Sequence, residues 1–315
     1  MKQNERPEGN RSGLPTKAIN IIKDTLLAAD EDIRDIRVMK AGMTNRSFLF
    51  TCHGQKYVIR VPGEGTAQLI RRTEEEAVYH MIAGRGLCDD VTYINAENGY
   101  KITKYIEDAR VCDPSDFRDV ERCITKMRDF HEMELSVSHT FDLYSQIQYY
   151  ETLRQTASVY PDYEDVKDRI WSLKVFIDRI PKKKTLTHID SVPDNFLFSG
   201  PGGGINLQLI DWEYAGMQDP HVDIAMFCIY AGYDKEQINR VIDLYFNGQC
   251  SDTVRIKCYC YVAIGGLLWS NWCEYKKRMG GAFGSYAARQ YEYAREYSAI
   301  ADKYIKEKFV KSGTC

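Results

Sequence analysis

The stretch that decides the fold is residues 187–198, which read Thr187-His188-Ile189-Asp190-Ser191-Val192-Pro193-Asp194-Asn195-Phe196-Leu197-Phe198. It contains the pattern H-x-D-x-x-x-x-N, and the apolar residues after the asparagine are typical of a β-strand. From average residue usage, chance would supply this pattern in a chain of such length about once in a hundred sequences. A second acidic residue, Asp211, stands sixteen positions after Asn195, at the end of another apolar run.

These residues have the chemistry that phosphoryl transfer requires. The reaction needs a carboxylate that orients the attacking hydroxyl and accepts its proton, and it needs oxygen ligands that hold Mg²⁺ on the phosphates. An aspartate and an asparagine five positions apart on one loop can serve both tasks, and Asp211 from a neighbouring strand can complete the metal site. The alternative is a turn whose Asp and Asn side chains satisfy nearby backbone groups, but such a turn does not require all four residues in this order.

The loop and the later aspartate resemble the signature of the kinase superfamily that joins protein kinases, aminoglycoside phosphotransferases and choline/ethanolamine kinases. The resemblance implies that Asp190 is the catalytic base, that Asn195 and Asp211 are Mg²⁺ ligands, and that His188 is a structural member of the loop. It also implies an α+β, protein-kinase-like two-lobed fold, with a small N-terminal lobe built on an antiparallel sheet and a larger, mainly helical C-terminal lobe. ATP and Mg²⁺ are the expected cofactors.

The segment that begins at Asp211 distinguishes between the families of this superfamily. Protein kinases have D-F-G here, whereas this chain has Asp211-Trp212-Glu213-Tyr214, which looks like the choline/ethanolamine kinases of the bacterial type. No typical protein-kinase activation segment follows, because residues 220–223 lead straight into a helical pattern. The glutamate that some choline kinases carry just after an F-D-I segment is not found after residues 222–224.

The pattern along the chain predicts three parts. Residues 1–14 are polar and are expected to form a flexible tail. Residues 15–106 are predicted to form the N-terminal nucleotide-binding lobe, because runs rich in aromatic and β-branched residues at 47–52 and 57–61 indicate a hairpin. Residues 107–315 are predicted to form the C-terminal catalytic and substrate-binding lobe, in which helical periodicity dominates.

The segment just before the first hairpin strand is one candidate for nucleotide contacts. Residues 41–48 include a G-M-T-N stretch that holds Gly42, Thr44 and Asn45. Taken alone, a single glycine in such a stretch indicates an ordinary turn. Similar segments occupy the nucleotide loop of choline kinases, so the resemblance implies that these three residues face the phosphates.

The second hairpin strand holds another candidate. Residues 57–61 have Arg60 where protein kinases have the lysine of V-A-I-K, and choline kinases resemble this chain in using arginine there. A guanidinium group can hold phosphate oxygens bidentately, so the exchange is chemically reasonable. The helix partner of Arg60 is expected among the glutamates at 74–76, and the R-x-x-E spacing from Arg72 favours Glu75.

Aromatic residues near the end of the chain indicate the phosphate acceptor. Trp269 and Trp272 are three residues apart and therefore share a helix face, for which core packing is the usual explanation. Choline kinases carry a similar W-x-x-W followed by a tyrosine, and aromatic faces attract a quaternary ammonium through the ring quadrupole. The resemblance therefore implies that choline is the substrate and that Asp190, Tyr214, Trp269, Trp272 and Tyr286 bind it.

Two alternatives stay open. Within the same superfamily, the acceptor could be ethanolamine, an aminoglycoside or another small amino-alcohol; an aminoglycoside site should be lined with carboxylates that meet several ammonium groups. From a different class, the chain could be a catalytically inactive module that binds choline or a nucleotide, although every catalytic side chain is present.

Composition excludes several other classes of protein. The 42 basic and 45 acidic residues give a formal net charge of −3, unlike the strongly basic footprint of a nucleic-acid binder. No apolar stretch approaches the ~20 residues of a membrane span, and the polar N-terminus lacks the apolar core of a secretory signal. The ten cysteines include no C-x-x-C pair, which favours free thiols in a reducing compartment. We therefore expect a cytoplasmic protein that acts on a small molecule, with no nucleic-acid partner and no membrane insertion.

Overall fold

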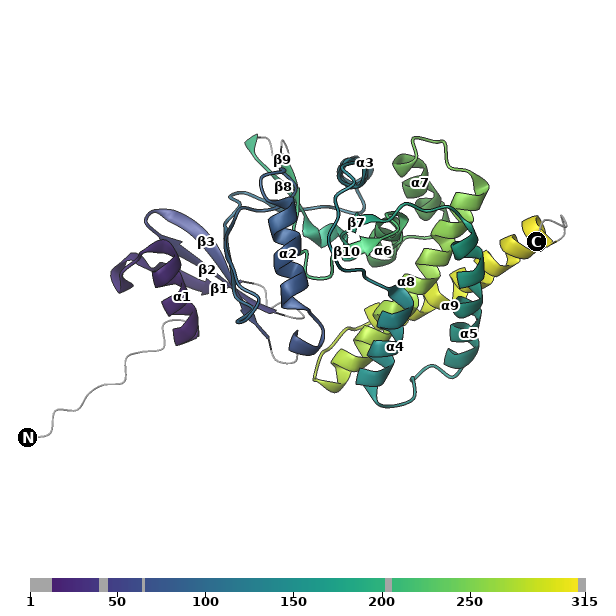
Figure 1. Cartoon of the computed structure of the whole chain (residues 1–315), viewed down its shortest axis with the longest axis horizontal. Helices are drawn as coiled ribbons and strands as arrows, with labels where there is room; N and C mark the ends of the chain where they lie inside the picture. The colour runs from purple at the N-terminus through teal and green to yellow at the C-terminus, as the bar shows by residue number, and fades with distance from the viewer. Residues whose placement is uncertain (1–12, 40–44, 64–65, 202–205, 311–315) are drawn as a thin grey trace, which may run out of the picture. The chain divides into compact units, whose positions relative to one another are not determined.

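The computed structural model describes residues 13–39, 45–63, 66–201 and 206–310. The chain divides into two compact units after Asp108 (Figure 1). Most of the predicted tail, residues 1–12, lies outside the described residues, and so do Gly42 and Thr44 of the predicted nucleotide loop.

The first unit contains a five-stranded antiparallel sheet with the strand order β1-β2-β3-β5-β4. Its strands are β1 (Arg34–Val38), β2 (Asn45–Cys52), β3 (Gln55–Pro62), β4 (Val91–Ile94) and β5 (Lys101–Lys104). β2 and β3 form the hairpin that the sequence predicted. The turn between them is short, because His53 and Gly54 both have positive φ angles and close it within two residues.

The first unit also contains two α-helices. They are α1 (Thr16–Leu26) and α2 (Arg72–Ile82), with short 3₁₀ turns at Asp30–Asp32 and Thr66–Gln68. Apolar side chains of α1 and of alternate strand positions form one buried cluster, whose members include Leu14, Ala18, Ile22, Phe48, Phe50, Ile59 and Ile102. This packing buries one face of the sheet and fixes the position of β3, the strand that carries Arg60.

The second unit is mainly helical. Its helices are α3 (Phe117–Glu132), α4 (Leu143–Arg154), α5 (Tyr163–Arg179), α6 (His221–Ala231), α7 (Lys235–Tyr245), α8 (Asp252–Arg278) and α9 (Tyr286–Ile305), followed by a π-helical turn at Lys306–Val310. α8 is buried at every position from Ile256 to Cys273, where apolar residues occupy most positions on all of its faces. α9 runs along it and α4 also packs on it (Figure 1). Gly266 permits the close approach of α9, because a Cβ atom there would lie 2.5 Å from the main-chain oxygen of Gln290.

Two short sheets hold the segments between the helices of this unit. One has the order β6-β8-β9, and in the other β7 pairs with β10. The strands are β6 (Arg110–Val111), β7 (Thr185–Thr187), β8 (Phe196–Ser199), β9 (Asn206–Leu209) and β10 (Gly216–Gln218). Residues 188–195 connect β7 to β8, and residues 210–215 connect β9 to β10. Strands therefore flank both segments that carry the predicted catalytic residues.

The α+β content predicted from the sequence is confirmed, with the antiparallel sheet in the first unit and most of the helices in the second. Within the part of the chain that the structure describes, no helix has the length and apolar character needed to cross a membrane.

Candidate active site

The loop between β7 and β8 brings Asp190 and Asn195 together. A 3₁₀ turn at Pro193–Asn195 folds the end of the loop back toward its start. The Asn195 amide Nδ2 donates to the main-chain oxygen of Asp190 at 2.8 Å and to its carboxylate Oδ2 at 3.2 Å. These bonds fix the orientation of both side chains, so that the carboxylate and the amide lie side by side.

A buried carboxylate from α6, Asp223, anchors the start of this loop. Its Oδ1 accepts a hydrogen bond from the main-chain N–H of Ile189 at 2.7 Å, and its Oδ2 accepts one from the N–H of His188 at 2.9 Å. The same Oδ2 lies 2.9 Å from Nε2 of His131, a buried residue of α3. Ile189 has a φ of 70°, an uncommon conformation for a β-branched residue, and the bonds to Asp223 hold it there.

The sequence did not single out Asp223 as a functional residue. The available signal was its place between the apolar residues Val222 and Ile224, which indicates burial. A buried charge must have partners, so Asp223 was a candidate for contacts with other segments.

His188 connects the loop to the segment that follows β9. Its side chain is fully buried, Nε2 lies 3.0 Å from the main-chain oxygen of Ile210, and its ring packs edge-on against Trp212 with centroids 4.6 Å apart. Because the carbonyl can only accept, Nε2 carries the proton. Burial lowers the pKa of His188, which favours the neutral ring. These contacts join the catalytic loop to the segment that follows β9.

Asp211 directly follows this connection. Its φ is 67°, in the left-handed region, and the main-chain N–H of Ile210 donates to the Asn195 main-chain oxygen at 2.9 Å. Among the described residues, no three His, Cys, Asp or Glu side chains converge to hold a metal ion by themselves. Mg²⁺ commonly takes only one or two protein ligands and completes its shell with water and phosphate oxygens. The Asp211 carboxylate and the Asn195 amide oxygen are ligands that fit such a shared site.

The surroundings of Asp190 are acidic. Burial, followed by the negative charges of Asp211 and Glu213, raises the pKa of the Asp190 carboxyl well above its usual value, against the opposing effect of Asn195. Glu213 is buried and was quoted in the sequence motif without an assigned role. A carboxylate with a raised pKa is a stronger base, and this suits it to accept a proton from an alcohol.

Three predicted substrate residues form one aromatic cluster. The rings of Tyr214 and Trp269 meet edge to face with centroids 5.5 Å apart, and those of Trp269 and Trp272 do so at 6.0 Å. All three side chains are buried. The Tyr214 hydroxyl lies close to the indole N–H of Trp272, so the polar atoms of these two residues meet within the cluster.

The fourth predicted residue, Tyr286, has a different neighbour. Its ring lies edge-on to Tyr230, with centroids 5.7 Å apart, and the Tyr230 hydroxyl donates to Oδ2 of Asp194 at 2.8 Å. Burial raises the pKa of Tyr286, and the negative charge of Asp190 adds to this effect. Tyr230 therefore connects Tyr286 to Asp194 of the catalytic loop.

A further tyrosine, Tyr150 of α4, was missed by the sequence reasoning. Its side chain is fully buried, and its hydroxyl lies close to the side chains of Gln146 and Tyr214. Burial raises the pKa of Tyr150, and the charges of Asp190 and Glu213 contribute in the same direction. No sequence signal marks it, because Tyr150 is one of three tyrosines in α4 and lies far from the catalytic loop along the chain. Its position becomes visible once α4 packs on α8.

In the first unit, Arg60 and Glu75 form a buried bidentate ion pair. Arg60 Nη1 bonds Glu75 Oε1, Nη2 lies 2.8 Å from Oε2, and Nη1 of Arg72 reaches the same Oε2 at 2.8 Å. Burial opposes ionisation of Glu75, but Arg60, with Lys101 and Arg72, outweighs it and lowers the pKa of Glu75 to about 2. Three cations thus surround one buried carboxylate.

The neighbouring side chains distinguish the three glutamates of α2. Glu74 pairs with Arg71, and Glu76 accepts a hydrogen bond from the main-chain N–H of Ala96, so Glu75 is the partner of Arg60. Arg72 also donates to Oδ1 of Asn45 at 3.0 Å, which ties the one described residue of the predicted nucleotide trio to the same cluster.

The family model for choline/ethanolamine kinases matches residues 36–246, which include the catalytic loop, the Asp211 segment and the Arg60–Glu75 pair. The chain belongs to the choline/ethanolamine kinase family. Membership confirms the predicted protein-kinase-like fold and an ATP-dependent kinase that acts on a small molecule.

Individual members of the choline/ethanolamine kinase family are similar over most of the chain. Protein LicA of Haemophilus influenzae is 26% identical over 268 residues, which cover 80% of this chain and 97% of that protein. The crystal structure of choline kinase LicA from Streptococcus pneumoniae has a TM-score of 0.77 and 27% identity, and covers 90% of this chain and 100% of its own. A crystal structure of LicA in complex with AMP has a TM-score of 0.76 and 27% identity, and covers 90% of this chain and 98% of its own.

Proposed function

We propose that this kinase transfers the γ-phosphoryl group of ATP to the hydroxyl of choline and so forms ADP and phosphocholine. The observation that carries the proposal is the contact of Trp269 with both Tyr214 and Trp272, close to the acidic surroundings of Asp190. Aromatic faces bind a quaternary ammonium well, because this cation is weakly hydrated and donates no classical hydrogen bond. The similarity to choline kinase LicA supports the same substrate.

In this mechanism Asp190 orients the choline hydroxyl and accepts its proton as the oxygen attacks the γ-phosphorus. Asn195 and Asp211 hold Mg²⁺, which when bound neutralises charge on the phosphate oxygens. His188 and Asp223 keep the loop in place through the hydrogen bonds described above. Tyr286 completes the substrate site.

The charges of both units suit their proposed ligands. Asp190, Asp211 and the buried Glu213 form a site that receives two cations, the metal and the ammonium group. In the first unit, the cationic cluster of Arg60 and its neighbours suits the phosphates of ATP, with Glu75 holding the guanidinium in place. We assign Gly42, Thr44 and Asn45 to the same nucleotide site. We place the enzyme in the cytoplasm because the described cysteines form no disulfide with one another.

Substrate competition tests the choice of alcohol. We expect ADP release to be fastest with choline, slower with ethanolamine and slowest with kanamycin, when each is compared by kcat/KM at saturating ATP. An equal or higher kcat/KM for ethanolamine would overturn the assignment of choline. Absence of ADP production with every alcohol would support the inactive binding module instead.

A matched pair of variants at Trp272 tests whether the aromatic cluster binds the choline cation. Trp272→Ala is expected to raise the KM for choline about tenfold, since a partly desolvated cation–π contact contributes about 1–2 kcal/mol. Trp272→Phe keeps a ring at the site and should lose less. If both variants raised KM equally, the ring would not be what binds the cation.

The pH profile tests the role assigned to Asp190. The raised pKa of its carboxyl places the acid limb of kcat/KM above the pH expected for an ordinary aspartate, because the base works only when deprotonated. Glu213→Gln removes a neighbouring negative charge, so it should lower the pKa and move the acid limb to lower pH. The exposed Glu164 provides a control, and Glu164→Gln should leave the profile unchanged. An unmoved limb in Glu213→Gln would show that another group controls it.

A further inference from the structure

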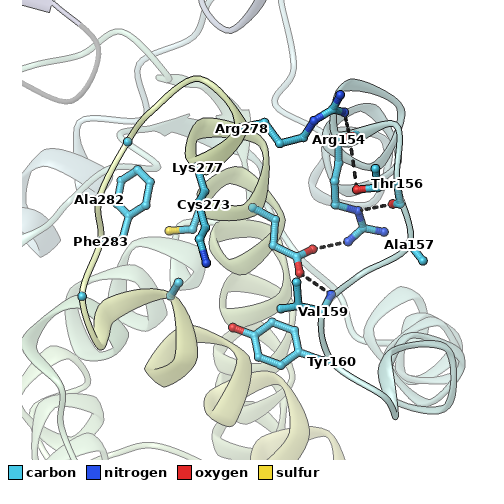
Figure 2. A pocket seen from close by; sticks show the side chains of 14 residues that line it. Arg154, Thr156, Ala157, Val159, Tyr160, Cys273, Lys277, Arg278, Ala282 and Phe283 are labelled. Carbon is cyan, nitrogen blue, oxygen red and sulfur yellow. Dashed lines mark hydrogen bonds and ion pairs between the residues drawn. The ribbon is translucent and has the colours of Figure 1, made fainter.

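A separate pocket of about 550 Å³ lies in the second unit, where the end of α8 and the start of α9 meet the segment between α4 and α5. This volume is within the usual range for small-molecule sites. Figure 2 shows Phe283 on one side of the hollow, Val159 and Tyr160 on the other, and Lys277 between them. Neither Asp190 nor the two tryptophans of the aromatic cluster line it.

The wall on the α4–α5 side is held in place by polar contacts with α8. Arg154 pairs with Glu274 of α8 and donates to Oδ1 of Asn271 at 2.8 Å. The Glu274 carboxylate also accepts from the Ser158 hydroxyl at 2.9 Å and from the main-chain N–H of Val159 at 2.8 Å. Because these bonds link the segment to α8 at several points, the pocket is preformed and does not depend on a ligand to open it.

The charges that line the pocket do not balance. Glu274 is the one acidic residue among the lining residues, all of which the structure describes, and Arg154 is paired with it. Lys277 and Arg278 are exposed and add two positive charges, so three cations face one carboxylate. The rest of the surface is largely apolar, with Ala157, Cys273, Ala282 and Ala287 beside the rings. A ligand that matches these walls has an apolar body and a negatively charged head.

One wall of the pocket also touches the aromatic cluster. The ring of Phe283 packs edge-on against Trp272, with centroids 5.4 Å apart. Phe283 lies in a segment between α8 and α9 where Gly280 and Gly284 have positive φ angles. A Cβ atom on Gly281 would lie 2.9 Å from the Phe283 ring, so the ring packs directly on the backbone. A ligand in the pocket therefore contacts a side chain that in turn contacts a residue of the substrate site.

We propose that this pocket binds an anionic amphiphile, a carboxylate or phosphate on an alkyl or aryl body, and that its occupancy changes the KM for the alcohol substrate through Phe283 and Trp272. Lys277 and Arg278 bind the head group, and the apolar wall receives the body. The effect on KM rests on the proposed function, whereas binding itself does not.

Binding is measured first, without turnover. The fluorescent probe 8-anilinonaphthalene-1-sulfonate is titrated onto the full chain with ADP, Mg²⁺ and choline at saturating concentrations, so that the catalytic sites are occupied and no phosphoryl group is transferred. Lys277→Glu should weaken probe binding about tenfold, the usual effect of losing a charge-assisted contact. Lys303→Glu, an equal change of charge on an exposed position of α9, should not. Ala287→Leu fills the pocket and should weaken binding, whereas Ala288→Leu at an exposed position should not.

Displacement of the probe by other amphiphiles then shows which head group the pocket prefers, and the KM for choline shows whether the pocket is coupled to the substrate site. Decanoate and decyl phosphate should displace the probe, each more strongly than decanol, and the stronger of the two anions shows which head group the site prefers. Decanoate should change the KM for choline at least threefold in the wild type and not in Ala287→Leu. Equal binding in Lys277→Glu and the wild type would overturn the site, and an unchanged KM with decanoate bound would overturn the coupling. A failure of choline turnover would leave the binding result standing and would contradict only the proposed function.

Discussion

Asp190→Asn is expected to lower kcat at least about a thousandfold while ATP binding is retained. General-base catalysis contributes about 10²–10⁴ to rates, and the asparagine can neither accept the proton nor orient the hydroxyl as a carboxylate does. Asp190→Ala should lose turnover to the same extent. ADP release measures the loss, and equilibrium binding of ATP to the variant shows that the nucleotide site is intact.

Although Asp190→Asn should lower kcat, it is not expected to lower the stability of the protein. Burial and the charges of Asp211 and Glu213 disfavour the ionised Asp190, so a neutral asparagine of the same shape should leave the free energy of unfolding unchanged or raise it. Thermal unfolding of Asp190→Asn and of a surface control, Asp178→Asn, provides the comparison. Appreciable turnover in Asp190→Asn would contradict the mechanism, and a large loss of stability would show that its effect on kcat is not specific.

Local patterns were sufficient to predict which residues of one segment come together. The spacing of Asp190 and Asn195 is short enough for one loop to bring them together, and the hairpin before α2 was visible in its β-branched and aromatic runs. Identification of Glu75 succeeded for a related reason, since the i, i+3 relation to Arg72 selects one of three adjacent glutamates on a helix face.

Contacts between distant segments were not visible in the same way. Asp223 binds backbone N–H groups of the loop, and a backbone group has no sequence signature. Tyr150 comes near Asp190 only through the packing of α4 on α8, and one buried tyrosine in a helix looks like any other core residue. The pocket beside Phe283 depends on three separate segments, of which none is unusual by itself.

Asp223→Ala is expected to destabilise the protein and to abolish turnover in the molecules that still fold. The change leaves the N–H groups of His188 and Ile189 and the ring of His131 without their acceptor. Each unsatisfied buried group costs about 1–3 kcal/mol, so the sum is a large part of the 5–15 kcal/mol that stabilises a typical protein. Denaturant unfolding measures this loss.

Asp219→Asn separates the two effects of the Asp223 variant. Asp219 precedes α6 and is also buried, but its carboxylate binds Lys257 at 2.6 Å and Tyr261 at 3.0 Å instead of the catalytic loop. Loss of the Asp219 charge leaves the buried Lys257 without its partner and should lower the free energy of unfolding by about 3–5 kcal/mol, as much as Asp223→Ala does. We expect folded Asp219→Asn to keep its kcat, because Ile189 retains its hydrogen bond and its positive φ. If Asp223→Ala, measured at a temperature where it is folded, kept a similar kcat, the carboxylate of Asp223 would stabilise the fold without positioning Asp190.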